Sequence, residues 1–73
     1  MKHSFKDINV NDEVFFNSSK VQHNYGLKWL VTEKLDKTKQ IIVMLKRTGL
    51  DEELCILNME DVLHHYPARH KKS

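Results

Sequence analysis

The chain has 73 residues, of which 40% are apolar, and it carries a formal net charge of +2 at pH 7. A chain of this length supports one small core, and its apolar content is too high for a disordered chain. No apolar run reaches the roughly 18 residues of a membrane-spanning helix, the first residues lack the apolar centre of a signal peptide, and a single cysteine excludes an internal disulfide. We therefore expect a single cytoplasmic domain over residues 1–73.

The two ends of the chain and the distribution of charge complete this outline. Residues 1–7 are expected to form a mobile lead-in from which Phe5 folds back onto the core, and residues 68–73 a mobile basic tail. Residues 34–50 hold five basic residues and one acidic residue, whereas residues 51–61 hold five acidic residues and no basic one. The molecule is therefore expected to be locally polarised.

Residues 8–16 predict a turn followed by a first strand. Asn11 and Asp12 are turn-forming residues, and Asn tolerates a left-handed backbone better than other non-glycine residues. Val14–Phe16 is typical of a strand, in which Phe15 faces the side opposite to its two neighbours.

Residues 17–28 lack a clear period and contain Gly26, which indicates a long loop. Long loops in compact domains often carry function. We expect Val21, Tyr25 and Leu27 to pin part of this loop to the body of the protein.

Residues 29–57 are typical of three antiparallel strands joined by turns at 36–39 and 48–51. In the first strand the odd-numbered residues 29 to 35 are expected to be buried, with Glu33 near the solvent-exposed end of the strand. The second strand, Gln40–Arg47, is apolar on both faces at its centre, which predicts a central strand. Gly49 suits a positive φ in the second turn.

The last part of this region is predicted to be a strand over Glu53–Leu57, in which Leu54 and Ile56 face one side and Cys55 faces the other. Asn58 is then a suitable N-cap for one short helical turn near residues 59–64. A short final strand at Tyr66 ends at Pro67. The expected class is all-β and mainly antiparallel, with about five strands.

The order of strand, long loop, three-strand meander, helical turn and last strand resembles an SH3-like small β-barrel. Residues 8–14, Ile-Asn-Val-Asn-Asp-Glu-Val, are similar to the V-x-x-G-D-x-V entry of small uncharacterised prokaryotic families, with Asn11 in place of the Gly. Residues 16–19 and 29–31 are also similar to segments of those families. The resemblance covers about residues 8–66. It implies a barrel that binds peptides, RNA, DNA or ribosomal surfaces, and the fold alone does not choose among them.

The sequence shows no catalytic constellation, and we expect neither an enzyme nor a cofactor. Cys55 lies in a predicted strand, where a cysteine usually packs as a small apolar residue. His64, His65 and His70 could be read as metal ligands, but adjacent histidines diverge and no spaced Cys or carboxylate completes a tetrahedral site. We therefore predict no metal site.

Two binding hypotheses remain. The first is a small adaptor module for a protein or peptide, with the 17–28 loop and outward-facing Phe15 and Met44 as its contact surface. The alternative is nucleic-acid binding through the basic hairpin and tail, with exposed aromatic residues stacking on bases. We expect no membrane partner, and a monomer or weak homo-oligomer. The predicted contact residues are Lys20, His23, Tyr25 and Lys28 in the loop, with Lys37, Lys39 and Arg47 on the hairpin for the alternative.

Overall fold

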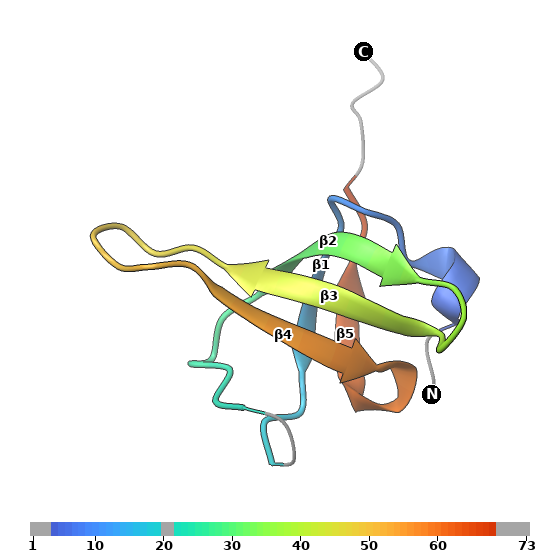
Figure 1. Ribbon diagram of the computed structural model, residues 1–73. Helices are drawn as coiled ribbons and strands as arrows, with labels where there is room; N and C mark the ends of the chain where they lie inside the picture. The colour runs from blue at the N-terminus through green and yellow to red at the C-terminus, as the bar shows by residue number, and fades with distance from the viewer. Residues whose placement is uncertain (1–3, 20–21, 69–73) are drawn as a thin grey trace.

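Five strands form one antiparallel sheet in the computed structural model, which describes residues 4–19 and 22–68. The order across the sheet is β4-β3-β2-β1-β5, so β4 and β5 are its two edges (Figure 1). The predicted all-β, mainly antiparallel class is confirmed. The elements in chain order are the short 3-10 helix η1 (Phe5–Asp7), β1 (Glu13–Phe16), β2 (Trp29–Leu35), β3 (Gln40–Leu45), β4 (Glu53–Asn58), the 3-10 helix η2 (Met59–Asp61) and β5 (Val62–Tyr66).

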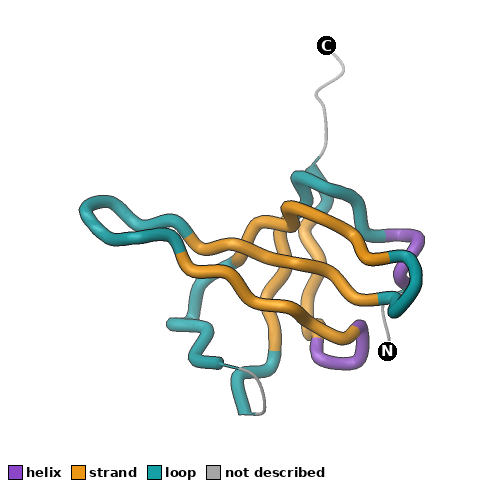
Figure 2. Tube along the Cα trace, in the orientation of Figure 1, coloured by secondary structure: helices purple, strands orange, loops and turns teal. Residues whose placement is uncertain are grey.

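The sheet curls around one core. Figure 2 shows one group of strands crossing in front of another, and the labels of Figure 1 identify β3 and β4 in front of β1 and β5. Phe16 of β1, Trp29 of β2, Ile41 of β3 and Leu57 of β4 are fully buried in a single cluster, so the inner faces of the strands meet. The rings of Phe16 and Trp29 pack edge to face at 5.1 Å, a favoured aromatic arrangement.

Strand β3 has the central position that its sequence predicts. It pairs with β2 on one side and with β4 on the other. Ile41, Val43 and Leu45 point into the core, while Ile42 and Met44 are half-buried on the opposite face. One apolar face of β3 is thus buried in the core, and both edges of the strand pair with neighbouring strands.

The burial predicted for β2 is correct only in its first half. Val31 is buried as expected, but Glu33 is exposed and Leu35 is only half-buried. The pairing with β3 shifts between Val31 and Glu33, so Thr32 is the extra residue of a β-bulge. An extra residue reverses the inward and outward alternation beyond it, and the predicted burial of Glu33 is therefore wrong.

The helical turn near 59–64 is present but short, because η2 ends at Asp61. Val62 is buried and pairs with Phe16 of β1, so strand pairing takes over where a second helical turn was expected. Asn58 makes no side-chain cap to η2. Its Oδ1 instead accepts a hydrogen bond from Gln40 Nε2 at 2.9 Å.

The entry turn has the predicted geometry, with Asn11 at a φ of 84°. Phe5 packs against the core as expected.

Residues 1–3 and 69–73, which include most of the predicted mobile ends, lie outside the described residues. Among the residues described, no helix has the length and apolar character needed to cross a membrane.

Candidate functional site

The outer face of the β2–β3–β4 meander is apolar. Leu30 lies opposite Met44, and Met44 lies opposite Leu54, so the three side chains form one row across three strands. Ile42 and Ile56 form a second pair beside it. We call these five residues the outer apolar face.

The β4 side of this face is the most exposed. Leu54 keeps 61% and Ile56 keeps 54% of their surface in contact with solvent, whereas Cys55 between them is buried. An antiparallel sheet with one wet face normally carries polar residues there. Large contiguous apolar patches on small proteins commonly mark interaction sites. The outer apolar face is therefore the strongest candidate for a binding surface.

A shallow hollow of about 250 Å³ lies over the β2–β3 part of the face. Leu30 and Met44 line its floor, and the charged residues Glu13, Lys28 and Lys46 stand around it. The cross-strand row also continues beyond Leu30, since Glu13 lies opposite Leu30. The apolar surface thus has a charged border on the β1 side.

A second feature joins the 17–28 loop to the start of β4. The hydroxyl of Tyr25 lies 3.1 and 3.3 Å from the two carboxylate oxygens of Glu53, and Arg47 Nη2 lies 2.6 Å from Glu53 Oε2. The Arg47 guanidinium is 4.3 Å from the centre of the Tyr25 ring, and His23 stacks on that ring at 4.7 Å. We call His23, Tyr25, Arg47 and Glu53 the loop cluster.

The loop cluster satisfies itself internally. The carboxylate of Glu53 neutralises Arg47, and two neighbours already lie against the Tyr25 ring. Arg47 Nε, by contrast, is buried without a hydrogen-bond partner among the described residues, so part of the guanidinium is less well satisfied than its Nη2. The arrangement holds the loop against the body, and Tyr25 keeps 39% of its surface exposed.

Asn24 anchors the same loop from the inside. Its Nδ2 donates to the carbonyl of Phe16 at 2.6 Å, and its Oδ1 accepts from the Gly26 N–H at 2.8 Å. Its own carbonyl accepts from Trp29 Nε1 at 3.1 Å. Asn24 is buried, so each of these bonds replaces one that water could have made. This role could not be predicted from sequence, because any Asn in a polar loop is typical of a turn residue.

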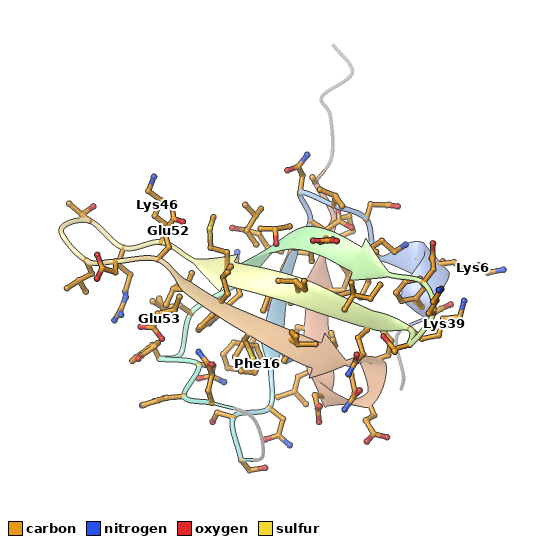
Figure 3. The ribbon with its side chains drawn as sticks, in the orientation of Figure 1. Lys6, Phe16, Lys39, Lys46, Glu52 and Glu53 are labelled. Atoms are coloured by element: carbon orange, nitrogen blue, oxygen red, sulfur yellow. The ribbon has the colours of Figure 1, made fainter. Side chains whose placement is uncertain are left out.

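The basic residues are divided between the two ends of the meander. Figure 3 shows Lys39 and Lys6 at one end, and Lys46 with Glu52 and Glu53 at the other. Lys34 and Lys39 lie over the Phe5 ring, at 4.5 and 5.2 Å from its centre. The cations of the hairpin therefore do not form one continuous patch with the loop cluster.

The predicted contact residues are likewise divided between the loop cluster and the β2–β3 turn. His23, Tyr25 and Arg47 meet in the loop cluster, and Lys28 Nζ lies 4.4 Å from the centre of the Tyr66 ring. Lys37 and Lys39 are exposed in the β2–β3 turn. Figure 3 places Lys39 at the opposite end of the meander from Glu53 of the loop cluster. Lys20 lies outside the described residues.

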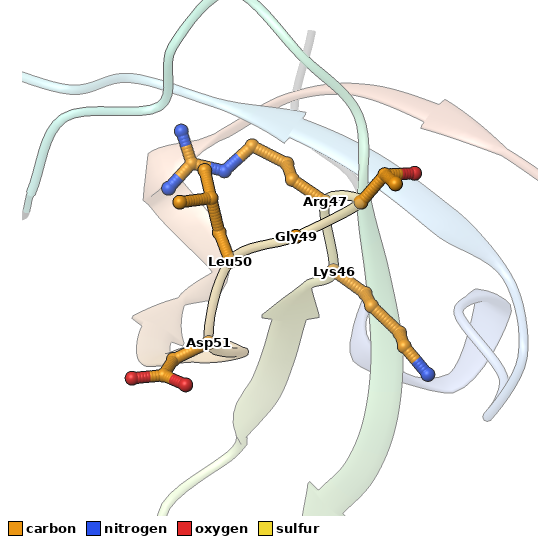
Figure 4. Close-up of a pocket in the computed structure, with 6 residues that line it drawn as sticks. Lys46, Arg47, Gly49, Leu50 and Asp51 are labelled. Atoms are coloured by element: carbon orange, nitrogen blue, oxygen red, sulfur yellow. The ribbon is translucent and has the colours of Figure 1, made fainter.

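A hollow of about 480 Å³ lies within the β3–β4 loop. It is lined by the six consecutive residues 46–51, as the close-up in Figure 4 shows. Gly49 takes a φ of 79° at the tip, as its position predicted. Because no second element closes this hollow, it is a feature of the turn rather than a ligand cavity.

Asp12, in the turn before β1, forms a buried polar centre. Its Oδ2 accepts from the Asn9 N–H at 2.9 Å and from His65 Nε2 at 2.7 Å, and its Oδ1 accepts from the Ala68 N–H at 2.8 Å. Burial acts to raise the pKa of Asp12, but the hydrogen bonds from Ala68, Asn9 and His65 outweigh it and hold the pKa below its usual value. An ionised carboxylate only accepts hydrogen bonds, so His65 Nε2 carries the proton.

His64, His65 and Cys55 have side chains suited to metal binding or nucleophilic chemistry. His65 bonds to Asp12, whereas His64 is exposed beside Phe15, so the two adjacent histidines diverge. Within residues 4–19 and 22–68, no three His, Cys, Asp or Glu side chains gather to hold a metal; His70 lies outside them. Burial, with a smaller effect of the Asp61 charge, raises the pKa of the Cys55 thiol and disfavours the reactive thiolate.

Comparison with known proteins adds no relative. The chain matches no protein-family model, and neither the curated proteins nor the solved structures include a significant match. The resemblance to SH3-like barrels accordingly stays a prediction.

Proposed function

We propose that this protein is a small binding module that docks on another protein or peptide through its outer apolar face. The exposure of Leu54 and Ile56, beside Ile42 and Met44 on the neighbouring strand, is the observation that supports this most directly. Side chains that lie largely in water contribute little to the stability of the fold. Their burial against a partner would instead contribute to the free energy of binding.

The amount of free energy is useful for a small interface. Full burial of a Leu or Ile side chain stabilises by about 1.5–3 kcal/mol. Since Leu54 and Ile56 are each more than half exposed, covering them would contribute about 2 kcal/mol together, or about 30-fold in Kd. The remaining affinity would come from Leu30, Met44 and the charged border.

Nucleic-acid binding is the weaker proposal. It requires a track of unpaired cations along one surface. Here Arg47 pairs with Glu53, and Lys34 and Lys39 lie at the other end of the meander. An outer face of aliphatic residues offers a nucleic acid neither charge nor aromatic stacking.

The test compares two sets of exposed apolar residues. The double variant Leu54→Thr/Ile56→Thr removes apolar surface and places at both positions a β-branched residue that suits a strand. Leu50→Thr is the matched control, because Leu50 is 57% exposed but lies at the loop tip, away from the face. Each tagged protein is used for affinity capture from the native cell extract, with and without nuclease treatment, followed by quantitative mass spectrometry.

We expect specific proteins that are captured by the wild type and by Leu50→Thr, and that fall about 30-fold with the double variant. Equal capture by the double variant would overturn the proposal. Capture that disappears on nuclease treatment, and survives the double variant, would favour nucleic acid.

A further inference from the structure

The two edges of the sheet are protected to different degrees. Proteins guard edge strands with Lys, Pro, bulges or short length, because an open edge pairs with other strands. The ladder between β5 and β1 is bulged between Phe15 and Phe16, and Pro67 follows β5 directly. The β5 edge is therefore irregular, and a proline follows its last residue.

The β4 edge lacks these protections. Its six residues contain no Lys and no Pro, and it pairs with β3 in unbroken register from Gln40 opposite Asn58 to Leu45 opposite Glu53. It also presents Leu54 and Ile56 on its outer side. A regular edge with exposed apolar side chains is suited to strand addition by an extended segment.

The charges at the ends of β4 indicate what kind of segment would fit. Asp51 and Glu52 are exposed just before the strand, and Glu60 is exposed just after it. The contact between Lys46 and Glu52 is 3.9 Å long between largely exposed side chains, so it neutralises Glu52 only weakly. Both ends of the edge thus favour positive charge on an incoming strand.

The same charges disfavour a second copy of this chain. Antiparallel pairing of two β4 edges about a two-fold axis at Ile56, which keeps outward side chains on one face, would place Glu52 of each copy opposite Glu60 of the other. Like charges directly opposite each other destabilise a strand pair. The occupant that fits is a different chain.

We propose that β4 takes up an extended basic segment of a partner protein, which adds as a sixth strand. Its backbone bonds to the free edge of β4, and alternate apolar side chains pack beside Leu54 and Ile56. Basic residues at its two ends face Asp51 and Glu52 at one end and Glu60 at the other. This inference rests on the proposed function, to which it adds the partner's chemistry and its mode of binding.

The test uses blocked synthetic peptides and the complete 15N-labelled protein. The probe is Lys-Lys-Val-Thr-Val-Lys-Lys, whose two valines lie on one face of a strand. One control replaces every Lys with Glu. A second control keeps the sequence but carries N-methyl groups on its three central amides, which removes the donors needed for strand pairing on either side.

We expect the basic peptide, titrated to millimolar concentration, to shift the amide resonances of residues 53–58. The acidic and N-methylated peptides should bind at least tenfold more weakly. Equal binding of the N-methylated peptide would overturn strand addition, and equal binding of the acidic peptide would overturn the charge requirement. Absence of binding by the basic peptide would overturn the whole inference. None of these results decides the proposed docking function, because loss of native capture in the Leu54→Thr/Ile56→Thr variant is measured separately.

Discussion

Met44 of β3 lies directly opposite Leu54 of β4, with both side chains on the outer face of the sheet. The pair is apolar in a position where solvent-facing strands usually carry polar residues. Neighbouring Cys55 and Leu57, by contrast, complete the core. Strand β4 thus carries two pairs of apolar residues, Cys55 and Leu57 buried in the core and Leu54 and Ile56 exposed on the outer face.

The first prediction separates these two sets by stability. Leu54→Thr/Ile56→Thr should change the free energy of unfolding by no more than about 0.5 kcal/mol, because exposed substitutions usually have small effects. Leu57→Ala should cost about 2–5 kcal/mol, because it removes fully buried atoms and leaves a cavity. Urea unfolding followed by Trp29 fluorescence measures both. Similar losses for the two variants would show that the outer face serves folding.

The second prediction concerns the buried anchor of the loop. Asn24→Ala should destabilise the protein by about 1–3 kcal/mol, because it leaves the carbonyl of Phe16 and the N–H of Gly26 without their partners. Asn17→Ala is the matched control, since the Asn17 side chain makes an exposed bond to the Ser19 N–H. Urea unfolding again gives the answer, and equal effects of the two variants would contradict the anchoring role.

The third prediction concerns the pH dependence of stability. The pKa of Asp12 is lowered in the folded protein, so its contribution is present above the unfolded-state value of about 3.9 and is lost as pH falls through the folded value. Asp12→Asn should therefore lower stability at neutral pH and flatten the loss of stability below about pH 4. Urea midpoints between about pH 2 and 7 measure the difference, and two parallel curves would refute it.

The fourth prediction concerns the loop cluster. Arg47→Lys keeps the charge but loses the planar guanidinium that both contacts the Tyr25 ring and bonds to Glu53. Amide hydrogen exchange at residues 22–28 should become faster, while exchange in β3 should change little. Lys46→Arg serves as control on the neighbouring, exposed cation. Unchanged exchange in the loop would show that the cluster does not hold it.

The fifth prediction concerns the thiol. Burial raises the pKa of Cys55 and blocks access to it, so the folded protein should react slowly with a thiol reagent such as Ellman's reagent. The rate should rise sharply across the urea unfolding transition. Rapid reaction in the absence of urea would contradict the buried position.

The meander could be predicted from sequence because its signals are local. Alternation of apolar residues, β-branched residues at 41–43 and turn residues at 36–39 and 48–51 are sufficient to place β2, β3 and β4. The left-handed Asn11 and the positive φ of Gly49 also follow from residue type alone.

The features that sequence reasoning missed depend on contacts between distant residues. The bulge at Thr32 arises in the pairing with β3, and η2 ends early because Val62 pairs with Phe16. The exposure of Leu54 and Ile56 depends on β4 being an edge, which alternation alone does not reveal.

Site-specific photo-crosslinking tests the central claim, that the outer apolar face is a docking surface, most directly. A benzophenone amino acid is placed at position 54 on the face or at position 50 on the loop tip, two sites of similar exposure. We predict that irradiation in native cells yields a defined protein adduct from position 54 that is weak or absent from position 50. The same products from both positions, or none from position 54, would contradict the claim.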